Sequence, residues 1–111
     1  KEKIIAQALI DIATALTSLG KIFIYLDKTA KDVKHFMILF SKLYDDYRQL
    51  LNAIYNKNYE EINLLLREYK QKKEQLEKFL KTVHDPLITQ VVTSAGIIYH
   101  QLQILAHETL L

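Results

Sequence analysis

The stretch IIAQALIDIATALTSLGKIFIYL, residues 4–26, decides the fold because its apolar residues recur every three or four positions. One seven-residue frame holds Ile5, Ile12, Leu19 and Leu26, with Leu9, Leu16 and Phe23 between them. Spacings that alternate between three and four place side chains on one stripe of a helix. The stretch therefore predicts an amphipathic helix that packs lengthwise against other helices.

The same rhythm continues through the rest of the chain. The first frame extends through Val33, Phe40, Tyr47 and Ile54, a second holds Ile62, Tyr69, Leu76 and Val83, and a third holds Ile88, Ala95, Leu102 and Thr109. Two glycines and one proline in 111 residues are too few for a turn-rich β architecture. The sequence predicts a single all-α domain covering residues 1–111, which is an ordinary domain size.

Signals for helix ends divide the chain into four helices, at about residues 2–27, 30–55, 59–84 and 86–109. Three pairs of residues mark helix starts: Thr29 with Asp32, Asn58 with Glu61, and Asp85 with Pro86. Connections of only a few residues force neighbouring helices to run antiparallel. We therefore expect an antiparallel, up-down-up-down four-helix bundle.

An alternative architecture makes the first two helices continuous. Residues 21–57 contain no glycine or proline, and the apolar frame passes through residues 27–32 without a phase shift. A single helix of about 55 residues, in an elongated or domain-swapped dimer, satisfies that pattern. The polar cluster around Asp27 and Asp32 argues against it.

Charge is distributed unevenly along the chain. The predicted third helix alternates acidic and basic residues at favourable helical spacings, as a solvated outer face does. By contrast, no side chain from Pro86 to His107 is formally charged, and between Ile4 and Gly20 only Asp11 is. Because protein interfaces are depleted in Lys, Glu and Asp, this pattern predicts a contact surface on the first and last helices. Its candidate residues are Gln7, Thr14, Ser18, Thr89, Thr93, Ile97, His100, Gln101 and His107.

Residues 4–26 are long enough to raise the question of a membrane span. However, Gln7, Asp11, Thr14, Ser18 and Lys21 follow one another at helical spacing and form a polar stripe. A polar stripe indicates an amphipathic helix rather than a lipid-spanning one. We expect no direct membrane contact. Since the chain begins at Lys1 rather than methionine, anchors outside these residues are compatible with the sequence.

Catalytic and metal-binding patterns are weak. A di-iron bundle needs Glu-x-x-His on two helices, and the nearest match is a single Asp32-x-x-His35. His100 and His107 are seven residues apart on one helix face, but two histidines alone do not make a metal site. No cysteine, glycine-rich phosphate loop or nucleophile elbow occurs in the sequence. The sequence predicts neither an enzyme nor a cofactor.

Several polar residues are assigned structural roles. Asp45, Asp46 and Arg48 are interpreted as a solvated charged turn of the second helix. Lys73 occupies a core position of its frame, so we expect either that its stem lies along apolar surface with the ammonium group in water or that it marks an end of the bundle. The tyrosines in the apolar frames are expected to pack in the core with their hydroxyls at its edge: Tyr44, Tyr47 and Tyr69.

Three functions are compatible with these features. The leading hypothesis is a non-catalytic structural or protein-interaction module that self-associates through its uncharged helices. The second is a ligand-binding or signalling bundle, such as the ectodomain of a membrane sensor. The third is a weak nucleic-acid binder that uses Tyr55 and Tyr59, but a net charge of +2 gives it little support. The sequence indicates no compartment.

Overall fold

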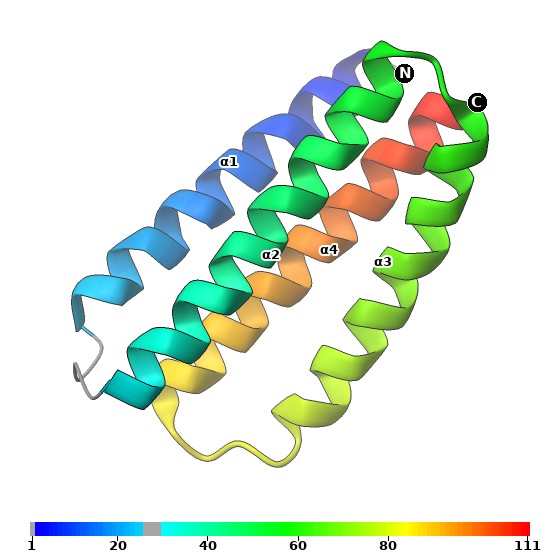
Figure 1. Cartoon of the computed structure of the whole chain (residues 1–111). Coiled ribbons are helices and arrows are strands. Elements are labelled where there is room, and N and C mark those ends of the chain that lie inside the picture. Colours follow the sequence, from blue (N-terminus) through cyan, green and yellow to red (C-terminus); the bar gives the residue numbers. More distant parts are fainter. Residues whose placement is uncertain (1, 26–29) are drawn as a thin grey trace.

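Four α-helices form the computed structural model, which describes residues 2–25 and 30–111 apart from the side chains of residues 23, 25, 30–33, 35 and 36. They are α1 (Glu2–Tyr25), α2 (Ala30–Tyr55), α3 (Tyr59–Leu80) and α4 (Pro86–Leu110) (Figure 1). The described residues contain no strand, so the predicted all-α class is confirmed. The helices pack into an elongated bundle of 43 × 24 × 21 Å.

The fourth helix is the centre of the packing. Its backbone runs close to α1 on one side and to α3 on the other, whereas α2 lies farther from both α3 and α4. Over the described residues, α1 and α2 barely touch. The start of α1, the α2–α3 connection and the end of α4 lie at the same end of the molecule (Figure 1).

Among the described residues, α4 contributes more residues to the hydrophobic core than any other helix. That helix buries Val91, Val92, Ala95, Ile98, Tyr99, Leu102, Leu105 and Ala106. Because α4 is covered by three other helices, much of its surface has no access to water, and charged side chains there would be costly to bury. Its lack of charge therefore follows in part from its central position.

The inner face of α1 explains why this helix lies so close to α4. Its buried residues are Ala8, Ile12, Ala15 and Leu19, in which small and large side chains alternate. The small side chains let the two backbones approach. Ile12 and Leu19 confirm the predicted frame, while Ala8 and Ala15 complete a stripe that the frame did not include.

The core-facing stripe of α2 was predicted only in part. The expected frame of Phe40, Tyr47 and Ile54 is only partly buried, and Tyr44 is exposed. The buried stripe instead consists of Leu43, Asp46, Leu50 and Ala53. The Asp46 carboxylate on this stripe is bound by polar side chains from α3 and α4, which lie on the same side of α2 as the core.

Two of the three predicted helix starts are confirmed. The Asn58 side-chain oxygen accepts a hydrogen bond of 3.2 Å from the Glu61 backbone N–H, and the Asn58 amide donates back to the Glu61 carboxylate. Asp85 Oδ1 accepts from the backbone N–H groups of Leu87 and Ile88 at 2.8 and 3.3 Å. Both side chains satisfy N–H groups that have no partner within the first helical turn. The third start, at Thr29 and Asp32, lies outside the described side chains.

The third helix is shorter than predicted. It ends at Leu80 rather than near His84, and the chain leaves it through a tight turn in which the Thr82 N–H donates to the Phe79 carbonyl. Pro86 disfavours helical geometry at the residue before it, and the intervening residues form the connection to α4 instead of continuing the helix. The described part of the first helix ends at Tyr25, and its predicted boundary at residue 27 lies outside the described residues.

The turn between α2 and α3 carries a backbone strain that the sequence did not reveal. The Asn58 N–H donates to the Ala53 carbonyl at 2.9 Å and the Lys57 N–H to the Ile54 carbonyl at 3.1 Å, as in a Schellman motif. Lys57 sits in the left-handed region with φ of 54°. Glycine is the residue that usually occupies this position.

The continuous-helix alternative does not describe this structure. The described parts of α1 and α2 are two separate helices that lie side by side (Figure 1). Residues 26–29, which join them, lie outside the described part of the chain.

Candidate interaction surface

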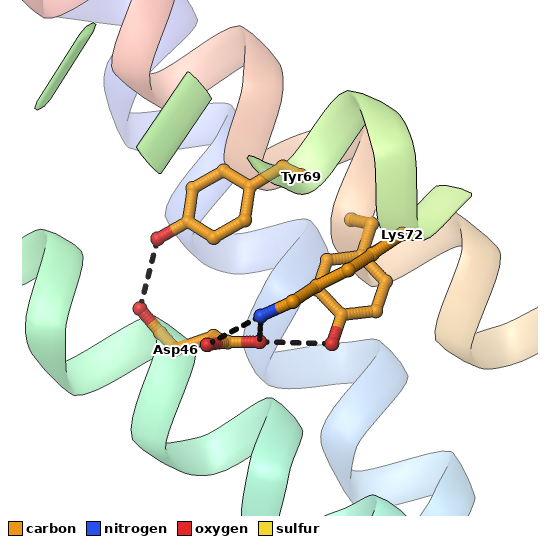
Figure 2. A network of polar contacts seen from close by, with 4 residues as sticks. Asp46, Tyr69 and Lys72 are labelled. Carbon is orange, nitrogen blue, oxygen red and sulfur yellow. Dashed lines mark hydrogen bonds and ion pairs between the residues drawn. The ribbon is translucent and has the colours of Figure 1, made fainter. Parts of the chain in front are cut away.

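A buried polar cluster connects three helices at the middle of the bundle. Asp46 of α2 is only 7% exposed. Its Oδ2 accepts a hydrogen bond of 2.8 Å from the Tyr99 hydroxyl of α4, and the Lys72 ammonium of α3 lies 2.9 and 3.1 Å from its two carboxylate oxygens. The Tyr69 hydroxyl donates to the Asp46 backbone carbonyl at 3.0 Å (Figure 2). Long side chains thus bridge the wide spacing between α2 and the other helices.

The environment of the cluster keeps both tyrosines protonated. Burial raises the pKa of the Tyr69 hydroxyl well above its usual value, and the nearby Asp46 carboxylate raises it further. Burial also raises the pKa of the Tyr99 hydroxyl, and so does its hydrogen bond to Asp46. Each hydroxyl therefore remains a donor, as the cluster geometry requires.

The Asp46 cluster corrects the interpretation of Asp45, Asp46 and Arg48 as a solvated turn. Asp45 and Arg48 are exposed, but Asp46 is buried and paired. Since a buried carboxylate without partners would be costly, the cluster favours one rotation of α2 over others. Its groups are mutually satisfied, which fits a structural role in holding α2 to α3 and α4.

An open groove runs between α3 and α4 and contains four of the predicted surface residues. Thr93, Ile97, His100 and Gln101 line its α4 side. Lys73, Leu76, Glu77 and Leu80 line its α3 side. Ile97 is 48% exposed, and Gly96 also lies in the groove. The groove encloses about 380 Å³ and is open to solvent.

The groove contains one polar contact across the two helices. The Lys73 ammonium lies 3.1 Å from His100 Nδ1, so the imidazole accepts from the ammonium when it is neutral. Lys73 is half-buried, as its place in the apolar frame predicted. His100 is thus engaged by α3 rather than by His107.

The other predicted surface residues are more scattered. Gln7, Thr14, Ser18 and His107 are exposed, and Thr89 is half-buried. The Gln7 amide donates to Asp11 at 2.9 Å, and the Thr14 hydroxyl donates to the Ile10 carbonyl of its own helix. The structure therefore gathers the α4 residues in one groove, while those of α1 belong to the polar stripe of a separate helix that packs against α4.

No arrangement suited to a metal ion is present within residues 2–25 and 30–111. No group of three or more histidine, aspartate or glutamate side chains lies close enough to hold one.

The largest feature that the sequence reasoning missed is a second apolar face on α1. Ile10 and Ile24 are 57% and 70% exposed, and Ala6, Ala13 and Gly20 are exposed beside them. By length and composition the segment Glu2–Ile22 resembles a membrane span, although core helices and signal sequences have the same character. Only 22% of its most apolar window is buried within the bundle. Most of this helix is therefore left uncovered.

Comparisons with protein-family models, with curated proteins and with solved structures gave no match to this chain. Its function is therefore argued from its own residues.

Proposed function

We propose that this chain is a non-catalytic structural or protein-interaction module that self-associates through the uncharged surfaces of α1 and α4. The observation that carries the proposal is the exposed apolar surface of α1. Beside its polar stripe and the face buried against α4, α1 exposes a further set of small and apolar residues that the bundle does not cover: Ala6, Ile10, Ala13, Gly20 and Ile24. Exposed apolar surface of this extent is typical of protein contact sites.

The surface of α4 supports the same proposal less strongly. Burial explains the missing charges on its inner side, but Thr93, Ile97 and His100 are exposed and still uncharged. In contrast, α3 covers its exposed side with charged residues such as Arg67, Glu68 and Lys70. Packing within the bundle therefore does not explain why the outward side of α4 is uncharged.

An antiparallel, up-down-up-down order of the four helices belongs to the proposal. Its support is the short α2–α3 and α3–α4 connections and the common end at which α1 begins and α4 ends (Figure 1). In that order α1 and α4 are neighbours, as their close packing requires.

A ligand-binding or signalling bundle is the second candidate function. The open groove between α3 and α4 supports it, because grooves between helices are common ligand sites. The common end of the first and last helices also suits insertion between two anchors. Hydrophobic spans on both sides of this chain in a longer protein would favour this candidate.

An NMR dilution series tests the leading proposal. We expect the amide signals of α1 and of Thr93, Ile97 and Gln101 to shift as concentration rises, because those residues enter a contact. Signals from the charged face of α3, such as Gln71, serve as the internal control and should stay constant. Concentration-independent spectra over the whole chain would reject self-association.

A further inference from the structure

The exposed apolar face of α1 has a regular pattern. Its residues follow one another at spacings of four and three, the signature of a helix-packing seam: Ala6, Ile10, Ala13, Thr17, Gly20 and Ile24. We call these six residues the outer stripe. All six are exposed, and the Thr17 hydroxyl is already bound to the Ala13 carbonyl at 2.9 Å. Covering the outer stripe would leave no side-chain hydrogen-bonding group unpaired.

The outer stripe repeats the pattern by which α1 already packs against α4. The buried stripe begins Ala8, Ile12, Ala15, and the outer stripe begins Ala6, Ile10, Ala13, two positions earlier. On the inner face this alternation of small and branched residues holds a helix at close range. The same pattern on the opposite face indicates that the occupant there is also a helix.

Gly20 is an independent indication that another chain approaches the outer stripe. Glycine is disfavoured in the middle of a helix relative to alanine. Among the described residues nothing requires it, because a Cβ at Gly20 would meet none of their atoms within 4 Å and its φ is not positive. The glycine is explained if a side chain of another molecule packs into the open space over Gly20.

The pattern of the outer stripe is complementary to itself when one copy is reversed. Aligning two α1 helices antiparallel about their common centre pairs Ala6 with Ile24, Ile10 with Gly20, and Ala13 with Thr17. Every layer then combines a smaller residue with a larger one, as interdigitating helices require. A parallel alignment instead places Gly20 opposite Gly20 and Ile24 opposite Ile24.

We propose that the outer stripe of α1 binds the outer stripe of a second copy of this chain in an antiparallel, two-fold symmetric dimer. Such an isologous contact closes on itself and stops at two copies. The flanks are compatible, because the polar side of one α1 meets the polar side of the other and brings Lys21 near the uncharged Gln7. The contact is a single pair of helices that touch over about 27 Å of their length. Such a contact buries a small area compared with most specific interfaces, so the dimer is expected to be weak.

This inference rests on the proposed self-association and identifies which face of α1 carries it. A lipid surface is the competing occupant. Lipid requires only an apolar face, whereas the alternation of residue sizes and the glycine are explained by a helix. A vesicle-flotation assay with neutral phosphatidylcholine separates the two: recovery of the protein with the vesicles, together with a monomeric state in solution, would overturn the dimer.

Cysteine cross-linking tests the antiparallel pairing, and the absence of native cysteine makes single-cysteine variants clean. Ala6→Cys and Ile24→Cys proteins are mixed and treated with a short bismaleimide. We expect the mixed Ala6→Cys/Ile24→Cys pair to be the dominant cross-linked species, because those positions meet in the antiparallel dimer. Gln71→Cys on α3, mixed with Ile24→Cys, is the matched control and should give only background. Cross-linked pairs of identical variants in excess over the mixed pair would overturn the antiparallel arrangement.

Charge insertion separates this inference from the broader proposal. Ala13→Arg should raise the dissociation constant at least tenfold, and Thr93→Arg on α4 should leave it unchanged if the outer stripe alone forms the contact. Retained dimerisation in Ala13→Arg with loss in Thr93→Arg would reject the outer stripe and keep self-association through α4. A wild-type protein that stays monomeric at every concentration would reject both.

Gly20→Ala distinguishes an interface role from a folding role. The added methyl group favours the isolated helix, so the denaturation midpoint of the dilute protein should rise. It also fills the gap that Ile10 of the partner enters, so the dissociation constant should increase severalfold. A variant that is more stable and dimerises at least as well as the wild type would contradict the proposed packing.

Discussion

The two sides of this bundle are built differently. On one side α4 packs closely against α1 and α3 through small and branched apolar residues. On the other, α2 stands farther away and adds Leu43, Leu50 and Ala53 to the core, while α1 and α2 barely touch. Long side chains that meet at Asp46 also connect α2 to α3 and α4. The first side is held by close apolar packing, and the second by apolar packing together with a buried polar cluster. The comparison shows that the helices are covered unequally. The fourth helix packs against all three others, whereas α1 is buried on one face and exposed on the opposite face.

The largest expected effect on the free energy of unfolding comes from the side on which α4 packs closely against α1 and α3. Leu102 of α4 is completely buried, so Leu102→Ala should lower the free energy of unfolding by about 2–5 kcal/mol through lost burial and the cavity left behind. Ile10→Ala, at an exposed position of α1, should change it by less than about 0.5 kcal/mol when the protein is dilute. Urea titrations of both variants measure the contrast. Similar losses in the two would mean that α1 is covered on its outer side even in the monomer.

The polar cluster around Asp46, which connects α2 to α3 and α4, should show the next largest effect on stability. Asp46→Ala removes the partner of Lys72 and of the Tyr99 hydroxyl, and we expect a loss of about 2–3 kcal/mol. This is below the range for fully buried pairs, because the Lys72 side chain reaches solvent. Asp45→Ala, one residue away and exposed, is the matched control with an expected change below about 0.5 kcal/mol. Equal effects in urea titrations would show that the carboxylate at residue 46 does not hold α2.

Alkaline pH should weaken the same polar cluster around Asp46. The folded-state pKa values of Tyr69 and Tyr99 lie above their ordinary value of 10.0, so the unfolded chain loses these protons first. The stability contributed by the tyrosines is therefore full below pH 10 and falls above it, by up to about 1.4 kcal/mol per pH unit for each tyrosine. Tyr99→Phe should reduce the slope between pH 10 and 11.5 in urea titrations. An unchanged slope would contradict the assignment of Tyr99 to the cluster.

The smallest expected effect concerns the α2–α3 turn. Lys57→Gly should raise the free energy of unfolding by about 1 kcal/mol, because glycine adopts the left-handed conformation at this position without strain. Lys57→Ala keeps the strain and is the matched control, with an expected change near zero. Thermal unfolding of the three proteins would reveal the difference. A stabilisation by alanine as large as that by glycine would attribute the effect to the lysine side chain instead.

Much of this architecture was predictable from local signals. The apolar rhythm and the scarcity of glycine and proline predicted four helices, and the side chains of Asn58 and Asp85 marked two of their starts. These signals are local because a cap acts within one helical turn and an apolar stripe within one helix. The end of α3 was less predictable, since the residues before Pro86 form the connection to α4 rather than a last helical turn.

The burial of Asp46 could not be predicted in the same way. Its partners lie 23 to 53 residues away in the sequence, and an aspartate beside another aspartate and an arginine has the composition of a solvated turn. The buried stripe of α2 includes this paired aspartate, so an apolar frame through Phe40 and Tyr47 was only half right.

Some residues of the candidate surface lie together in the structure. The sequence indicated the uncharged character of α1 and α4, and Thr93, Ile97, His100 and Gln101 share one groove. The outer stripe of α1 was not among the predicted residues. It is nevertheless visible in the sequence as a second set of small and apolar residues at spacings of four and three.

The most direct test of self-association through α1 is sedimentation equilibrium of the wild type and Ala13→Arg over a concentration series from about 10 µM to about 1 mM. The account predicts that the wild-type mass rises from 13.0 kDa towards twice that value, while Ala13→Arg remains at 13.0 kDa throughout. A wild type that stays at the monomer mass, or a variant that associates equally well, would contradict it.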